Sequence, residues 1–352
     1  MRKGWEYKKL GDLCDIYQPK TLATEQLVVD GKYYVYGANG IIGRYNDYNH
    51  EQSEILLTCR GATCGTINIS QPYSWINGNA MVIHRKSEDL SFDFLKYLML
   101  SLDYSLIITG AAQPQITRQK IAPIIVKFPS LSVQQSIVSE LDKINELIRL
   151  KKEQLKDYDN LAQSIFYEMF GDPVVNEKGW EVKRITDLCV EISAGGDASK
   201  HEIKKTKDEI FSVPVYSNGI DEDGLYGYSN HATINQPAIT LAARGTIGAA
   251  FIRTEPYIPI IRLVSVIPDL SKISLTYLFY ILKQTEWDRT GGTIPQLPVP
   301  KVKQLTLPLP PLPLQQAFAQ RIELIEQQKA EIQSTIADLE TLLASRMQYW
   351  FD

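Results

Sequence analysis

The sequence predicts an α+β protein in which one structural unit occurs twice, each copy having a globular part followed by a long helical part. Motifs from residues 4–135 return in the same order in residues 179–316. Residues 132–170 and 314–352 contain no glycine or proline, and their apolar residues recur with heptad spacing. A length of 352 residues suits two or more domains of ordinary size. We therefore expect a pseudo-twofold internal repeat.

The repeat is clearest at the start of each copy, where residues 4–14 and 179–189 are identical at seven of eleven positions. Ordered self-similarity of this kind indicates a duplicated structural unit. Four later pairs of motifs follow in order: Gly43-x-Tyr45-x-x-x-Asn49-His50 with Gly224-x-Tyr226-x-x-x-Asn230-His231, Arg60-Gly61 and Gly65 with Arg244-Gly245 and Gly248, Thr109-Gly110 and Pro114-Gln115 with Thr290-Gly291 and Pro295-Gln296, and Pro129-x-Leu131-x-x-Gln134-Gln135 with Pro310-x-Leu312-x-x-Gln315-Gln316.

The globular parts contain short β-rich runs that Gly, Asn and Pro separate. We expect strands at residues 54–58, 80–84, 121–128, 238–242 and 261–267. Short helices are expected near residues 92–102 and 275–283. Both parts are therefore interpreted as α+β or mostly β domains.

The two glycine-free stretches are expected to be long helices, since prolines stand just before or at their starts, where a missing N–H does least harm. A single amphipathic helix is marginal in water, so we expect the two helices to cover each other as an antiparallel coiled coil that joins the globular domains. Lys151, Lys329 and Arg346 interrupt the seam, either as polar residues that fix its register or as snorkelling side chains. The expected seam residues are Ile137, Leu141, Ile144, Ile148, Leu155 and Ile165 in the first helix and Ile322, Ile325, Ile332, Ile336, Leu339 and Leu343 in the second.

Several functional classes lack their sequence signatures. The sequence has no P-loop, no dinucleotide-binding Gly-x-Gly-x-x-Gly, no adenine-methyltransferase motif and no paired metal-ligand motif. We therefore expect no catalytic residue, no metal site and no cofactor in this chain. A net charge of −4, four cysteines, and the absence of a secretory signal and of an 18-residue apolar run lead us to expect a cytoplasmic protein without membrane contact.

Both globular parts repeat side chains that are typical of nucleic-acid recognition. Arg can contact guanine through two hydrogen bonds, and Asn or Gln can contact adenine in the same way, while Tyr, Ser and Thr can hold phosphates. A solvated arginine on a hairpin turn explains Arg60-Gly61 and Arg244-Gly245 about equally well. The candidate DNA-contacting residues are Asn39, Arg44, Tyr45, Asn46, Asn49, Arg60, Thr63, Thr66, Asn79, Gln113 and Gln115 in the first copy and Asn218, Tyr226, Tyr228, Ser229, Asn230, Arg244, Thr246 and Gln296 in the second.

Two motifs make the chain resemble the specificity subunits of type I restriction–modification systems. One is Phe166-Tyr167-Glu168-Met169-Phe170-Gly171-Asp172-Pro173, which Asn176 and Lys178-Gly179-Trp180-Glu181 follow; the other is Pro311-Leu312-Pro313-Leu314-Gln315-Gln316. The resemblance covers essentially the whole chain. It implies target-recognition domains at residues 1–130 and 173–311, conserved helical spacers at 131–172 and 312–352, and a bipartite asymmetric DNA site.

The resemblance also implies a division of labour. This chain would bind double-stranded DNA without catalysing a reaction. Two modification subunits would bring S-adenosylmethionine and methylate adenine N6, and restriction subunits would bring ATP and Mg²⁺ chemistry. The chain is short for the family, which leaves open the targeting subunit of a type II-like or methylation-only system. From different classes, a catalytic DNA enzyme and a non-DNA adaptor rod also stay open.

Overall fold

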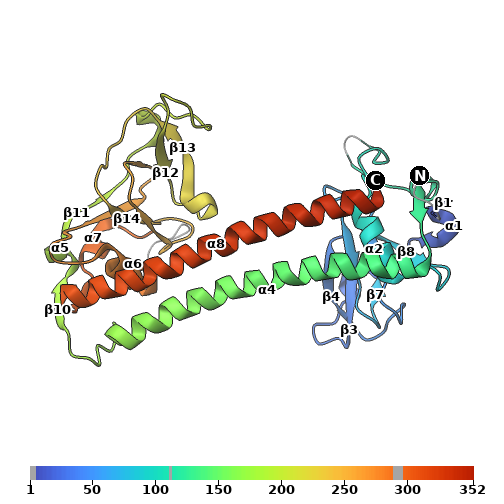
Figure 1. The fold of residues 1–352 in the computed structure, drawn as a ribbon, viewed down its shortest axis with the longest axis horizontal. Helices are drawn as coiled ribbons and strands as arrows, with labels where there is room; N and C mark the ends of the chain where they lie inside the picture. Colours follow the sequence, from blue (N-terminus) through green and yellow to red (C-terminus); the bar gives the residue numbers. More distant parts are fainter. Residues whose placement is uncertain (1–4, 111–112, 288–295) are drawn as a thin grey trace. The chain divides into compact units, whose positions relative to one another are not determined.

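The computed structural model describes residues 5–110, 113–287 and 296–352. It divides into two compact units. The first unit comprises Met1–Lys152 with Ser334–Asp352, and the second comprises Glu153–Gln333. Figure 1 labels their helices and strands. Both units mix helices with strands, which confirms the α+β prediction. None of the described helices is both long enough and apolar enough to cross a membrane.

Three sheets form the globular part of the first unit. A four-stranded antiparallel sheet has the order β2-β8-β5-β6, a three-stranded sheet has the order β4-β3-β7, and β1 pairs with β9. β3 is antiparallel to β4 and parallel to β7. The strands are β1 Glu6–Lys9, β2 Cys14–Tyr17, β3 Tyr33–Gly37, β4 Gly40–Tyr45, β5 Ile55–Thr58, β6 Ile67–Ile69, β7 Trp75–Ile76, β8 Ala80–Arg85 and β9 Ile125–Phe128.

Strand order in the second unit is the same, with β11-β17-β14-β15, β13-β12-β16 and β10-β18. The internal repeat predicted from the sequence is therefore a repeat of topology as well. Its strands are β10 Glu181–Arg184, β11 Cys189–Ala194, β12 Val213–Tyr216, β13 Leu225–Ser229, β14 Ala238–Leu241, β15 Ala250–Arg253, β16 Ile258–Pro259, β17 Val264–Pro268 and β18 Thr306–Leu309.

The helices also come in equivalent sets. Two of them are 40 residues long and free of breaks, close to the stretches without glycine or proline. The helices are α1 Leu10–Leu13, η1 Thr24–Gln26, α2 Phe92–Ser101, α3 Arg118–Ile121, α4 Leu131–Phe170, α5 Ile185–Leu188, η2 Ala198–Lys200, η3 Asp221–Gly224, α6 Leu275–Gln284, α7 Val299–Lys303 and α8 Leu312–Phe351.

Two strand predictions were too long at their N-terminal ends. The run at 121–128 begins with Ile121, which ends the short helix α3, and only Ile125–Phe128 pairs as a strand. The run at 261–267 begins with Ile261 and Arg262, whose φ angles of 53° and 62° are incompatible with a strand. In each place an apolar residue precedes the paired strand: Ile121 is buried at the end of α3, and Ile261 is exposed in a turn. Composition alone therefore indicates a longer strand than the backbone forms.

The repeat was misaligned by three residues at one motif. Val35 of β3 pairs with Gly43, and the equivalent Val215 of β12 pairs with Gly227, not with Gly224. His50 bridges Ser74, whereas Ile234 takes the same role opposite Tyr257. Asn49-His50 and Asn230-His231 are therefore similar in sequence but do not occupy equivalent positions in the fold.

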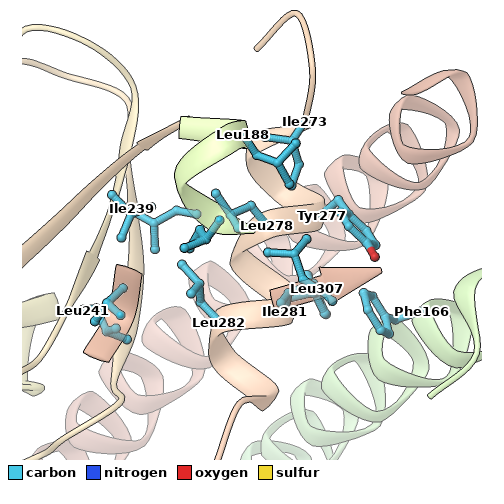
Figure 2. Packing of buried hydrophobic residues seen from close by; sticks show 14 of the residues in the cluster. Phe166, Leu188, Ile239, Leu241, Ile273, Tyr277, Leu278, Ile281, Leu282 and Leu307 are labelled. Atoms are coloured by element: carbon cyan, nitrogen blue, oxygen red, sulfur yellow. The ribbon is translucent and has the colours of Figure 1, made fainter. Parts of the chain in front are cut away.

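The core of the second unit lies around α6. Ser274 caps this helix, since its hydroxyl accepts a hydrogen bond from the amide of Tyr277. Figure 2 shows α6 side chains, Leu278 and Ile281 among them, between Ile239 of β14 on one side and Phe166 of α4 on the other. All four residues are buried, with at most 3% of their surface exposed. This packing attaches the C-terminal part of α4 to the globular part of its own unit.

The first glutamine of each Gln-Gln motif anchors a long helix. Gln134 is fully buried; its Oε1 accepts from the amide of Ser91 at 2.8 Å, and its Nε2 donates to the carbonyls of Asp89 and Pro129, both at 2.9 Å. Gln315 is also fully buried and makes the equivalent bonds with Ser274 and Pro310, at 2.8 and 2.7 Å. The second glutamine of each motif is exposed. The repeated glutamine thus ties the start of the long helix to two segments. One segment directly precedes the long helix, and the other directly precedes the short helix α2 or α6.

Each unit also contains contacts between its own segments of α4 and α8. In the first unit, Arg346 binds Glu140 through two nitrogens, and Lys152 lies 2.8 Å from Glu340. In the second unit, Lys329 lies 2.8 Å from Asp159. Two of the three charged residues that interrupt the heptad pattern, Lys329 and Arg346, therefore face carboxylates of the other helix.

Candidate nucleic-acid interface

Each Arg-Gly loop lies against the segment that carries the repeated glutamine. In the first unit the backbone of Arg60 bridges Gln115, and the amide of Gly61 donates to the carbonyl of Pro114 at 3.0 Å. In the second unit Arg244 bridges Gln296 in the same way, and its Nη2 lies 3.4 Å from the Gln296 side-chain oxygen. The fold therefore joins two motifs that are far apart in the sequence.

The Asn39-Gly40 and Asn218-Gly219 turns each place an asparagine beside an Arg-Gly loop. In the first unit the Thr63 hydroxyl donates to the side-chain oxygen of Asn39. In the second unit the Thr246 hydroxyl donates to the backbone oxygen of Asn218 at 2.7 Å. We name Asn39, Arg60, Thr63 and Gln115 the first polar cluster, and Asn218, Arg244, Thr246 and Gln296 the second polar cluster.

The loop glycines are required by the backbone and leave space for a ligand. Gly61 and Gly245 have φ angles of 91° and 67°, a region that other residues rarely adopt. A Cβ atom at either position would meet no atom of the described chain within 4 Å. The loops therefore have a fixed shape with open space beside it, where another molecule could approach the backbone.

The two polar clusters differ in how freely their side chains can contact a ligand. All four residues of the first polar cluster are exposed. Asn218 in the second is half-buried and its amide is used within the protein, because it accepts from the amide of Ala243 at 2.7 Å and donates to the carbonyl of Ile261 at 2.6 Å. Arg244 is half-buried, and its Nε atom is buried without a hydrogen-bond partner among the described residues.

Several other candidates in the first unit support the fold. Arg44 packs its guanidinium over the ring of Tyr34 at 4.3 Å and donates to the Tyr34 hydroxyl at 2.9 Å. Asn49 bonds both backbone groups of Ile76, at 2.8 and 3.0 Å. Tyr45 packs edge-on against Trp75. Exposed candidates that lie outside the first polar cluster are Asn46, Asn49, Thr66, Asn79 and Gln113.

The second unit shows the same division. Ser229 is fully buried and donates its hydroxyl to the carbonyl of Glu202 at 2.9 Å. Tyr228 is half-buried, and its backbone pairs with that of Lys204. Tyr226 is exposed, with the Lys205 ammonium 3.8 Å from its ring centre. Asn230 is exposed and accepts from His231 at 2.9 Å.

All twelve expected seam residues are buried or half-buried. Ile137 and Leu141 are fully buried, while Leu155, Ile165, Leu339 and Leu343 are half-buried and the rest are buried. Phe166 and Phe170 were not predicted as core residues, yet they are buried among Tyr277 and Phe318. The available signal was two aromatic residues four positions apart, the first of them directly after the seam residue Ile165.

A basic short helix, which was not predicted as part of the site, follows each of Gln115 and Gln296. Gln115 is followed by α3 with Arg118 and Lys120, and Gln296 by α7 with Lys301 and Lys303. The recurrence of lysine at equivalent places of the two copies was the available signal. Cations beside a polar cluster suit the backbone phosphates of a nucleic acid.

The four cysteine thiols, of which Cys59 and Cys64 lie in or next to the first Arg-Gly loop, show no sign of activation. Burial raises the pKa of Cys14 and of Cys189 to about 12, and it also raises the pKa of Cys59, next to Arg60. These thiols are therefore protonated at neutral pH and are poor nucleophiles. Within the described ranges, no group of three or more His, Cys, Asp and Glu side chains could hold a metal ion. The polar clusters are suited to hydrogen bonding with a ligand.

Comparison with known proteins gives one consistent family. The family described as "Type I restriction modification DNA specificity domain" matches residues 2–157 and again residues 177–340. A type I specificity subunit of Mycoplasma pneumoniae is 28% identical over 325 residues, which cover 90% of this chain and 87% of that protein. The MjaIX specificity subunit of Methanocaldococcus jannaschii is 25% identical over 301 residues, which cover 75% and 68%.

Solved structures share the fold. The S subunit of a type I restriction–modification system from M. genitalium aligns with a TM-score of 0.58 at 15% identity, over 99% of this chain and 96% of that one. A chain from a study of assembly and conformational transition of the type I system aligns with a TM-score of 0.60 at 17% identity, over 99% and 97%.

Proposed function

Because the chain belongs to the type I restriction–modification DNA specificity family, whose members recognise DNA without catalysing a reaction, we propose that its two polar clusters each contact one half of a bipartite, asymmetric DNA site. The observation that carries this proposal is the presence of the two clusters at equivalent places of a duplicated fold. Their side chains are those that read guanine and adenine edges in the major groove. The neighbouring basic helices α3 and α7 are suited to the phosphates on either side.

The difference between the clusters supports two unlike half-sites. Asn39 and Arg60 are exposed, and Asn39 accepts from a side-chain hydroxyl that can itself rotate, whereas the amide of Asn218 is already bonded to two backbone groups. In the second unit we therefore assign base contact to Arg244 and Gln296 and a supporting role to Asn218. Asn49 and Ser229 are given supporting roles on the same grounds.

We further propose that α4 and α8 pair as an antiparallel coiled coil that sets the gap between the half-sites. The support is the order of the ion pairs within the units, in which residues 140, 152 and 159 of α4 face residues 346, 340 and 329 of α8. Residue numbers rise along α4 while those of their partners fall along α8, which is the order of an antiparallel pair. Inserting one heptad into each helix adds about 10 Å, which corresponds to roughly three base pairs of gap. The bases read in each half-site are expected to stay the same.

Through the complex that its family forms, the chain is proposed to dock two adenine-N6 methyltransferase subunits and restriction subunits, which would supply S-adenosylmethionine, ATP and Mg²⁺. Methylome sequencing of cells that carry the chain with its modification partner would reveal the half-sites, the gap and the modified base together. Exchange of residues 1–130 for those of a relative should change one half-site and leave the other intact. A change in both half-sites, or no sequence preference at all, would contradict the proposal.

A paired substitution separates base reading from phosphate contact. Arg60→Ala should weaken binding of the assembled complex to its own site by roughly 5- to 150-fold, corresponding to about 1–3 kcal/mol, and relax the preference at one base pair. Arg118→Ala, on the exposed side of the neighbouring α3, should weaken binding to all sequences about equally and lower its salt dependence. Equal loss on every sequence for both variants would assign Arg60 to the phosphates instead.

A further inference from the structure

A pair of histidines in the second unit has an arrangement that DNA recognition does not use. The chain has four histidines, and two of them, His201 and His231, come from segments that follow η2 and β13. Nδ1 of His201 lies 3.4 Å from Nε2 of His231, while the ring centres are 5.4 Å apart. The two nitrogens therefore lie on the facing edges of the two rings.

The other nitrogen of His231 is held by a side-chain oxygen. Nδ1 of His231 lies 2.9 Å from Oδ1 of Asn230, and since an amide oxygen only accepts, Nδ1 carries the proton. Nε2 of the neutral ring then presents a lone pair toward His201. An oxygen that fixes the outer nitrogen in this way is the usual support of a metal-binding histidine.

The distance between the facing nitrogens fits one shared cation. With metal–nitrogen bonds of about 2.0–2.1 Å and a tetrahedral angle, two ligand nitrogens stand about 3.4 Å apart. A hydrogen bond between two ring nitrogens would be shorter, near 2.9–3.0 Å. From this geometry we propose that His201 and His231 bind a divalent transition-metal ion, with water in its other coordination positions.

The chemistry of the pair restricts which ions fit. Imidazole suits Zn²⁺, Cu²⁺ and Ni²⁺, whereas Mg²⁺ and Ca²⁺ prefer oxygen ligands. Among the described residues no third His, Cys, Asp or Glu joins the pair to make a group of three. The site thus has two protein ligands and exchangeable positions, so it binds more weakly than a four-ligand structural zinc site. A bound ion would connect the segment after η2 to the segment after β13.

His50 provides a contrast in the same chain. Its Nδ1 lies 2.6 Å from the side-chain oxygen of Asn49, but its Nε2 faces the hydroxyl of Tyr17 at 2.9 Å. A neutral tyrosine hydroxyl is a much weaker metal ligand than a second imidazole. His50 therefore serves as the control for His201 and His231.

The test is titration of the full chain with Zn²⁺ alone, followed by calorimetry and by NMR of labelled histidine rings. We expect one equivalent to bind and to shift the ring signals of His201 and His231, while those of His50 and His84 stay in place. His201→Ala and His231→Ala should each weaken binding at least tenfold, and His50→Ala should leave it unchanged. Asn230→Ala should weaken binding without abolishing it, because it removes the support and keeps both ligands.

Two controls keep the outcome decisive. Both histidines lie outside the buried core, so the variants are expected to fold, and an unchanged unfolding midpoint without metal checks this. Cys64 is half-buried and could bind Zn²⁺ itself, so the titration is repeated with Cys64→Ser. Retention of full affinity by His201→Ala, or equal shifts at all four histidines, would overturn the proposal. Because the readout needs no DNA, its failure is distinguishable from failure of the proposed DNA contacts.

Discussion

Replacing Gln134 with alanine would remove the side chain that ties the start of α4 to the loop before α2. The change leaves three backbone groups without their partner: the amide of Ser91 and the carbonyls of Asp89 and Pro129. A buried polar group that loses its partner costs about 1–3 kcal/mol, and water can reach the two that are only partly buried. We therefore expect the first unit to lose about 2–4 kcal/mol.

The neighbouring Gln135 is the matched control, since it has the same side chain one position later and is exposed. Gln135→Ala should change stability by less than about 0.5 kcal/mol. In the second unit Gln315→Ala removes two bonds, so its cost should be smaller, about 1–3 kcal/mol.

Hydrogen exchange followed by mass spectrometry can report each unit by its own peptides. For Gln134→Ala, the protected amides of the first unit should exchange roughly 30- to 1,000-fold faster, as 2–4 kcal/mol requires. Peptides of the second-unit core around α6 should be unaffected. If Gln134→Ala exchanged no faster than Gln135→Ala, the glutamine would not be the anchor that its hydrogen bonds indicate.

Three further predictions concern the helices and the Arg-Gly loop. Phe166→Ala should destabilise the second unit by about 3–5 kcal/mol in denaturant unfolding, whereas Tyr167→Ala, at an exposed ring, should cost far less. Hydrogen bonding by Arg346 lowers the pKa of Glu140, so their contribution is present above the ordinary carboxyl pKa and is lost as pH falls through the lower folded value. The pair is partly exposed to solvent, so Arg346→Met should reduce this acid sensitivity only slightly in pH-dependent unfolding. Gly61→Ala meets no neighbouring atom and should cost only the backbone strain, about 1–2 kcal/mol in the same unfolding assay.

The elements that the sequence predicted well are those whose residues interact locally. Absence of glycine and proline with regular apolar spacing located α4 and α8 to within two residues at each end. The short helices expected near residues 92–102 and 275–283 are α2 and α6, and a serine hydroxyl caps the start of each. Such signals depend on neighbours along the chain, so no knowledge of the tertiary fold was needed.

The candidate interface depended on contacts that the sequence does not encode locally. Asn39 meets Thr63 because the β3–β4 and β5–β6 loops, which belong to different sheets, lie together, and Arg60 meets Gln115 because the segment between α2 and α3 lies along the Arg-Gly loop. Sequence could not tell that the Asn218 amide bonds two backbone groups, whereas the Asn39 side chain is exposed and accepts from the Thr63 hydroxyl. The two sequence copies were misaligned by three residues at Gly43 for the same reason. Strand pairing, and not residue identity, decides that Gly227 is the glycine equivalent to Gly43.

The positions at which the two copies agree explain how their loops can differ. Gln134 and Gln315 share two bonds at equivalent places of the fold, one with the serine amide before the short helix and one with a proline carbonyl before the long helix. Each glutamine lies at a helix start and not in an Arg-Gly loop. Because stability rests on these ties and on the cores around α2 and α6, a change at an exposed loop residue such as Asn39 or Arg60 removes little packing. A duplicated scaffold of this kind tolerates exchange of side chains at the loops. Two copies of one fold can therefore come to read two different sequences without loss of the shared framework.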